Sequence, residues 1–168
     1  MSLKKALFKP AAFFKGFLLP LAQDASSREA VIVGSILAKV SIPSFHSSAA
    51  LIKLTEFEYT LGSGYFIKVL IGKRYALPTA AIDMLVDFFY KYTEEDPDEG
   101  KVPEMPVMWH QTLLNFVQMY RANLTDDHVT KIKVILKIQT HHAITAEIRR
   151  EMFGMVKTAN KDGDVDME

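Results

Sequence analysis

Histidines and serines are the first side chains to consider for catalysis or metal binding, and their spacing favours neither. A zinc site on one helix usually needs two histidines four residues apart, often with a glutamate between them. None of the five histidines has that spacing, and within a helix we expect adjacent His141 and His142 to point away from each other. Ser47 beside His46 lacks the third group and the oxyanion site that nucleophilic catalysis requires. We therefore predict no metal, no cofactor and no enzymatic activity.

Two further patterns resemble sites but have simpler explanations. Gly62-Ser63-Gly64 has the glycines of a phosphate-binding loop, yet no G-K-S/T follows and no strand precedes it. We interpret these glycines as the end of a helix. Acid pairs one helical turn apart, such as Asp83 and Asp87, could act as acid and base only in a pocket that separates their pKa values. Exposed helix surface is the expected setting.

Basic residues give the one positive signal for binding. The chain has 20 Lys and Arg residues and 20 Asp and Glu residues. Ten of the acids and two of the lysines fall in residues 94–104 and 161–168, so the remainder carries a net charge of +8. Such a body could attract polyanions, although solvated helix faces have the same composition.

Four cations are our candidates for binding RNA or a partner: Lys73, Arg74, Arg149 and Arg150. The first two follow a predicted helix, where a fork-shaped guanidinium can reach phosphate. We expect Glu147 or Glu151 to neutralise Arg150 in part. Lys133 and Lys137 share one helix face, whereas the aromatic residues fall at core spacing and form no stacking platform.

The elements that position these residues are helices. Apolar residues recur with a period of 3.6 and period-two alternation is nearly absent, which predicts an all-α fold. Eight helices should begin near residues 10, 27, 44, 64, 78, 106, 125 and 145. Ser26 and Glu29 form a capping box, and Gly34 marks the close approach of a neighbour. The spacing favours antiparallel pairs in a HEAT-like array, with a closed helical bundle as the alternative.

The domain organisation follows from composition. We predict one helical domain over residues 4–157, with an acidic surface loop or disordered insert at 93–105 and a disordered acidic tail at 158–168. There is no cysteine, which excludes disulfides. Residues 3–22 predict an amphipathic helix, because lysines interrupt the apolar run; no membrane span or membrane partner is expected.

Six strings occur in order along residues 4–151 and resemble the C-terminal, all-helical part of the bystin family. They are Lys4-Lys5-Ala6-Leu7-Phe8-Lys9-Pro10 with Phe14-Lys15-Gly16, Arg28-Glu29-Ala30 with Gly34-Ser35, Ser41-Ile42-Pro43 with His46-Ser47-Ser48-Ala49-Ala50, Tyr75-Ala76-Leu77-Pro78, Trp109-His110-Gln111, and Glu147-Ile148-Arg149-Arg150-Glu151. Family members carry a long charged N-terminal region, so we expect this chain to be a C-terminal fragment. The stretch 93–105 is longer than the family pattern leads us to expect.

The resemblance implies a non-catalytic factor of small (40S) subunit biogenesis with a helical-repeat fold. It implies a role in 18S rRNA precursor processing and precursor export, through binding to pre-rRNA, ribosomal proteins and other assembly factors. It also implies a nuclear and nucleolar location, with passage to the cytoplasm on late precursor particles. The alternative is a protein–protein adaptor without direct RNA contact; an adhesion-adaptor role is the weaker version of that alternative.

Overall fold

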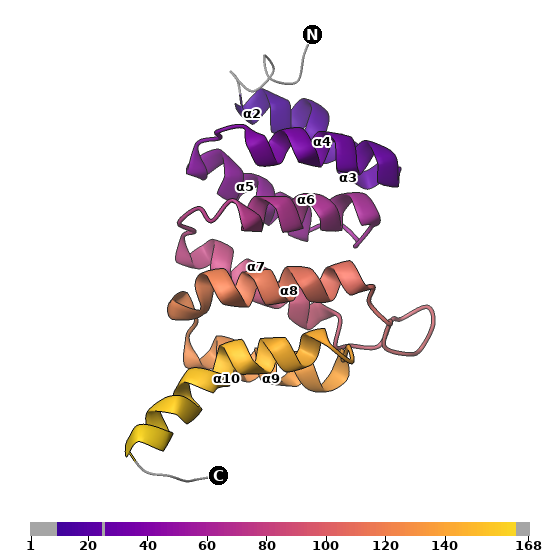
Figure 1. Cartoon of the computed structure of the whole chain (residues 1–168). Coiled ribbons are helices and arrows are strands. Elements are labelled where there is room, and N and C mark those ends of the chain that lie inside the picture. The colour runs from indigo at the N-terminus through magenta and orange to yellow at the C-terminus, as the bar shows by residue number, and fades with distance from the viewer. Residues whose placement is uncertain (1–9, 25, 164–168) are drawn as a thin grey trace.

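The computed structural model describes residues 10–24 and 26–163 and contains only helices, turns and loops within them (Figure 1). This confirms the all-α class. The predicted first helix is continuous from residue 10 to residue 24 but has three parts. The elements are α2 (Pro10–Phe13), the π-helical η1 (Phe14–Leu18), α3 (Leu19–Asp24), α4 (Ser27–Lys39), α5 (Ser44–Thr55), α6 (Leu61–Gly72), α7 (Thr79–Lys91), α8 (Val107–Tyr120), the 3-10 turn η2 (Arg121–Asn123), α9 (Asp126–Ile138) and α10 (Ile144–Gly163).

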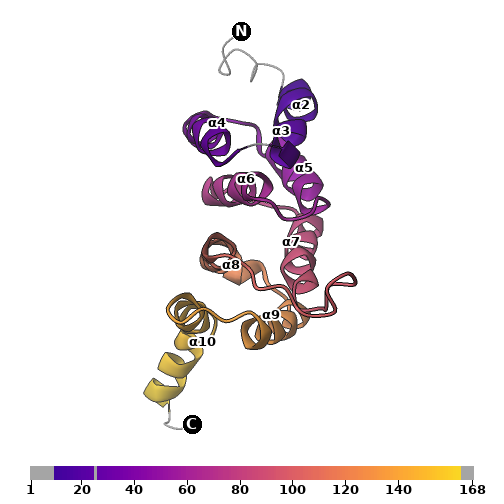
Figure 2. The same ribbon diagram turned by 90° about the vertical axis from the view of Figure 1, so that its right-hand side faces the viewer.

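The helices form two layers that are stacked along one axis (Figures 1 and 2). One layer runs through α3, α5, α7 and α9, and the other through α4, α6, α8 and α10, each helix packing on the next. The first and last described helices lie at opposite ends of the stack (Figure 1). A closed bundle would bring those two ends together, so the architecture is an open array of helical hairpins of the repeat type.

Aromatic side chains fill the centre of the stack, as their helical spacing predicts. Phe89, Trp109 and Phe116 are fully buried, and Phe88 is nearly so. The Trp109 ring lies edge-on to Phe89 at 5.5 Å between centroids, which is a favoured arrangement for aromatic pairs. The junction of α7 and α8 is therefore a core and offers no aromatic platform to a ligand.

Capping residues specify where the helices begin, and the start of α6 corrects a sequence prediction. The Ser26–Glu29 capping box begins α4 as expected. The interpretation of Gly62-Ser63-Gly64 as a helix end was wrong, because α5 already ends at Thr55 and these residues form the first turn of α6. Thr60 caps that turn reciprocally with Ser63. The Tyr59 ring packs against Gly64, where a Cβ atom would lie 2.5 Å from the ring, so the glycine serves packing.

The π-helical segment η1 was not predicted, and Pro20 explains it. A proline has no N–H and its ring collides with the carbonyl four residues earlier, here that of Gly16. The wider π turn moves that carbonyl away, and the Leu19 N–H donates to the carbonyl of Phe14, five residues back. The chain thus continues through the proline into α3.

The structure gives the local geometry of two segments that composition alone described. Residues 92–106 form a surface loop with its own turn, in which Asp96 donates its N–H to the Lys101 carbonyl at 2.8 Å and accepts from Gly100. Helix α10 continues to Gly163, past residue 157, because residues 155–162 contain neither glycine nor proline. Residues 164–168 of the expected tail, and Lys4, Lys5 and Lys9 at the other end, lie outside the described residues. No helix in the described ranges is long and apolar enough to span a membrane.

Candidate nucleic-acid interface

A cationic groove of about 700 Å³ lies between α9 and α10 at the end of the stack. We call it the α9–α10 groove. Four basic side chains line it together with three small or apolar residues: Lys133, Lys137, Arg149, Arg150, Ala146, Phe153 and Gly154. All four basic residues are exposed. Two of them, Arg149 and Arg150, are among the four sites that the sequence indicated.

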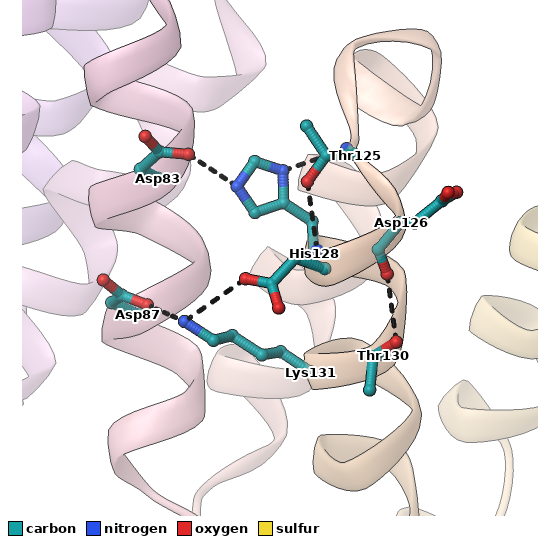
Figure 3. A network of polar contacts seen from close by, with 8 residues as sticks. Asp83, Asp87, Thr125, Asp126, His128, Thr130 and Lys131 are labelled. Carbon is teal, nitrogen blue, oxygen red and sulfur yellow. Dashed lines mark hydrogen bonds and ion pairs between the residues drawn. The ribbon is translucent and has the colours of Figure 1, made fainter.

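Helix α9 presents its two lysines because its other face is fixed to α7 (Figure 3). Thr125 caps the helix, accepting from the His128 N–H while its own N–H donates to His128 Nδ1 at 3.1 Å. His128 Nε2 lies 2.6 Å from Asp83 Oδ1, and Lys131 Nζ lies 2.8 Å from Asp87 Oδ1. Lys131 Nζ also lies 4.0 Å from Asp127 Oδ2, one helical turn earlier in α9. Asp83 and Asp87 are thus tethers for α9.

Helix α10 is held by buried side chains and by one arginine. Ile148 is fully buried and Met152 nearly so, which directs Arg149 and Arg150 outward. Arg121 Nη1 donates to the Glu151 carbonyl at 2.6 Å and lies 3.9 Å from the Glu151 carboxylate. At the start of α10, His141 Nδ1 accepts from the backbone N–H groups of residues 143 and 144.

The groove keeps most of its positive charge. Arg150 pairs with Glu147 at 2.9 Å, as predicted, and this exposed pair is worth little free energy. Among the described residues, no carboxylate oxygen lies within 4.0 Å of Lys133, Lys137 or Arg149. The Lys133 ammonium lies 5.4 Å from the centre of the Phe153 ring, a cation–π contact that leaves its charge in place. The groove can therefore offer three unpaired cations to an anion.

Lys73 has an intramolecular role that the sequence did not reveal. Its ammonium donates to three carbonyl oxygens at the end of α4: Leu37 at 2.9 Å, Ala38 at 3.3 Å and Val40 at 2.6 Å. A lysine has three N–H donors, so all are used. Partial burial lowers the pKa of Lys73. The Lys73 side chain could contact phosphate only if its hydrogen bonds to the end of α4 were broken.

Arg74 is exposed on the α6–α7 turn and is separated from α10 by α8 in the helix order of that layer. Its backbone is left-handed, with φ of 61°, and its N–H donates to the Ile71 carbonyl to close the end of α6. The structure therefore brings Arg149 and Arg150 together with Lys133 and Lys137, and leaves Lys73 and Arg74 elsewhere. The role of the four predicted residues in binding stays a prediction.

The histidine and serine patterns have structural settings. His141 and His142 belong to the turn before α10, and their rings stack at 4.4 Å between centroids. The expectation that they point apart assumed a helix and was wrong. Ser47 is fully buried in α5. Within the described residues, no group of three or more His, Cys, Asp or Glu side chains could hold a metal ion.

An open stack of helical hairpins is typical of a helical-repeat scaffold protein. The Bystin family model matches residues 1–162, and the chain belongs to the bystin family. Bystin from Dictyostelium discoideum is 51% identical over 156 residues, covering 91% of this chain and 32% of that protein. Bystin from Homo sapiens is 44% identical over 170 residues, covering 100% of this chain and 38% of that protein. The chain thus spans about a third of the length of these relatives.

Proposed function

We propose that this chain is the helical part of a non-catalytic assembly factor of the small ribosomal subunit and docks on the 18S rRNA precursor through the α9–α10 groove. Membership of the bystin family supports the assembly role. The gathering of three unpaired cations and Arg150 in one groove is the observation that carries the RNA contact. On this proposal the protein works in the nucleus and nucleolus and follows late precursor particles into the cytoplasm.

The groove suits a nucleic-acid backbone more than a base edge. Guanidinium groups form paired hydrogen bonds with phosphate oxygens, and lysine ammonium groups supply mobile point charges. Such contacts position a protein on RNA without reading its sequence. The groove lining contains no Asn, Gln, Asp, Glu, Ser or Thr side chain, and its arginines and lysines could read guanine edges alone, so most selectivity for the precursor would come from RNA shape and from neighbouring proteins.

The mechanism that this arrangement favours is temporary occupation of an rRNA site. Helices α9 and α10 are anchored on α7, α8 and η2, so the cations are held in place before binding. A rigid cationic surface can occupy an immature rRNA site until a later factor replaces it. The partners on this proposal are precursor particles, ribosomal proteins and other assembly factors.

Salt dependence of RNA binding is the direct test. A labelled single-stranded fragment of 18S precursor should bind with a log–log salt slope of about −2.8, because four contacts contribute about −0.7 each. Replacing Lys133 and Arg149 with glutamine should weaken binding and reduce the slope to about −1.4. The control Arg28→Gln with Lys39→Gln removes the same charge from α4, at the far end of the stack, and should leave the slope unchanged.

Equal slopes for the two double variants would sink the groove as an RNA site. Sedimentation in cell extract then tests the assembly role separately. Co-migration of the chain with 18S precursor in sucrose gradients supports it. A full-length relative that stays free of precursor particles would instead favour the adaptor alternative, in which a helical groove captures a protein and binding barely responds to salt.

A further inference from the structure

The α9–α10 groove contains one aromatic side chain beside its four cations. Phe153 lines the groove from α10 and is only half-buried, so part of its ring faces the groove. It differs in this respect from Phe89 and Trp109, which are fully buried in the core. Single half-exposed rings are common on protein surfaces, so the surroundings of this ring decide what it can do.

Small residues leave room beside the ring. Ala146 and Gly154 line the groove from the same helix, and neither has a side chain that reaches beyond Cβ. Ala146, Arg150 and Phe153 lie four and seven residues apart, so they share one face of α10. A Cβ atom added at Gly154 would lie 3.3 Å from Cγ of Arg150, so the arginine stem runs along the glycine. The wall that α10 contributes is therefore low and apolar next to the ring.

The Lys133 ammonium covers the ring in the free protein. It lies 5.4 Å from the centre of the Phe153 ring, and no carboxylate oxygen in the described ranges lies within 4.0 Å of it. Lys133 is exposed and its stem is flexible, so its ammonium can move from the ring to a phosphate. Stacking of a base on an aromatic ring is stronger than an exposed cation–π contact. A base can therefore replace the lysine on the ring.

An unpaired nucleotide offers both groups that this arrangement accepts. Its phosphate suits the unpaired charges of Lys133, Lys137 and Arg149, and its base has a π-face that stacks on a ring. A double-stranded RNA helix keeps its bases stacked on one another and presents phosphates, hydroxyls and base edges instead. A duplex could therefore use the cations of the groove but not the Phe153 ring.

Building on the proposed RNA contact, we infer that the α9–α10 groove binds single-stranded RNA with one unpaired base stacked on Phe153. In the bound state Lys133 leaves the ring and joins Lys137 and Arg149 on the neighbouring phosphates. Phe153 adds affinity for unpaired nucleotides without reading the identity of the base, because every base has a π-face. The parts of a precursor RNA that fit this groove are loops, bulges and ends.

Fluorescence anisotropy with three labelled RNA probes tests the inference on the whole chain. The probes are a short single strand, the same strand paired with its complement, and an abasic strand of equal length. Phe153→Leu keeps an apolar side chain and removes the ring, so it should weaken binding of the normal single strand about five- to tenfold. Duplex affinity should stay within about twofold, because a duplex offers no free base to the ring. The abasic strand should bind the wild type more weakly than the normal strand does, and should not distinguish Phe153→Leu from the wild type.

Further variants separate stacking from charge. Phe153→Tyr keeps the ring and should retain the wild-type affinity for the single strand within about twofold. Phe57→Leu removes another half-buried ring, just after α5 and outside the groove lining, and should leave all three affinities unchanged. Phe153→Leu should leave the log–log salt slope of single-strand binding unchanged, whereas Lys133→Gln should reduce its magnitude by about 0.7.

Wild-type affinity of Phe153→Leu for the single strand would overturn the inference, as would equal weakening of its single-strand and duplex binding. Equal affinity of the wild type for the normal and the abasic strand would overturn it without any substitution, so the test does not depend on how a variant folds. The proposed RNA contact fails on a different result, which is an equal salt slope in the Lys133/Arg149 and Arg28/Lys39 variants. The two failures are therefore distinguishable.

Discussion

His128 joins α9 to α7 through one short contact, in which its Nε2 lies 2.6 Å from Asp83 Oδ1 (Figure 3). The Thr125 N–H donates to Nδ1 of the same ring, so the proton of the neutral imidazole is on Nε2 and is donated to the carboxylate. The ring thus caps its own helix and tethers it to a neighbour. These two hydrogen bonds of His128 fix the orientation of α9 and so the position of Lys133 and Lys137.

Asp83→Ala should lower the free energy of unfolding by about 0.5–1.5 kcal/mol, since the His128 N–H loses its acceptor. The carboxylate is half exposed, which places the expected value in the lower part of that range. Asp83→Asn keeps an acceptor oxygen and should cost less. Urea denaturation measures both, with Asp127→Ala as the control at a highly exposed acid of α9. A larger loss for Asp127→Ala than for Asp83→Ala would contradict the tether.

Lys73→Met should destabilise the fold by about 1–3 kcal/mol, because three carbonyls at the end of α4 lose a charged donor. The methionine keeps the apolar stem and removes only the ammonium. Arg74→Gln is the control, because this exposed neighbour keeps the same left-handed backbone requirement. Thermal unfolding followed by circular dichroism compares them. Similar melting temperatures for both variants would mean that the cap contributes nothing.

Gly34→Ala should cost about 1–3 kcal/mol, because the added methyl group would overlap the Tyr65 ring that packs on α4. The close approach that the sequence predicted is therefore specific to one neighbour. Gly72→Ala, at the end of α6, meets no atom within 4 Å and should instead stabilise by up to about 1 kcal/mol. Chemical denaturation of the two variants should give changes of opposite sign. A stabilising Gly34→Ala would show that Tyr65 moves aside freely.

Gln139→Ala should free the acidic loop, because this buried side chain makes three hydrogen bonds to the backbone of Tyr92, Pro103 and Met105. We expect a loss of about 2–4 kcal/mol, since buried donors and acceptors are left unpaired. Hydrogen exchange should speed up in residues 92–106 before it does in α4. Gln111→Ala, at an exposed glutamine whose side chain accepts from Lys68 and from no other side chain in the described ranges, serves as the control. An unchanged rate of hydrogen exchange in residues 92–106 would show that Gln139 does not hold the loop.

His110 should make stability fall as the pH is lowered. Burial, and then the neighbouring His141, lower the pKa of His110 below 6.5 in the folded protein. Between the folded and unfolded pKa values the unfolded chain binds the proton and the folded one does not. Stability is therefore full above about pH 6.5 and declines below it, by at most about 1.4 kcal/mol per pH unit. His110→Gln should flatten the pH dependence of the urea midpoint between pH 7 and pH 5, whereas His142→Gln should leave that dependence unchanged.

Most helices of this fold could be predicted because their signals are local. Period-3.6 burial and capping residues place the starts of α4, α9 and α10 within one residue of the structure. Helix α6 was placed three residues late, because Gly62 and Gly64 look like a helix end unless the Thr60–Ser63 capping pair is considered. The π turn also has a local signal in Pro20, but the resulting shift of hydrogen bonds is not encoded in periodicity.

The candidate sites were less predictable, since they depend on contacts between distant parts of the chain. Lys73 looked free because its acceptors in α4 are 33 to 36 residues away. The pairing of Lys133 and Lys137 was visible in their spacing, but their approach to Arg149 requires α9 and α10 to be placed side by side. Phe153 gave no signal beyond that of a core residue.

Helix α10 supplies two of the four cations of the α9–α10 groove, and within its layer the described helices give it one neighbour, α8. In a linear array a unit with a neighbour on one side only opens more readily than a unit packed on both sides. The affinity of the groove for an anion is then reduced by the fraction of molecules in which α10 is undocked. Arg121, which holds α10 through Glu151, thereby tunes a binding equilibrium from outside the groove, and an anion bound in the groove would in turn keep the end of the stack closed.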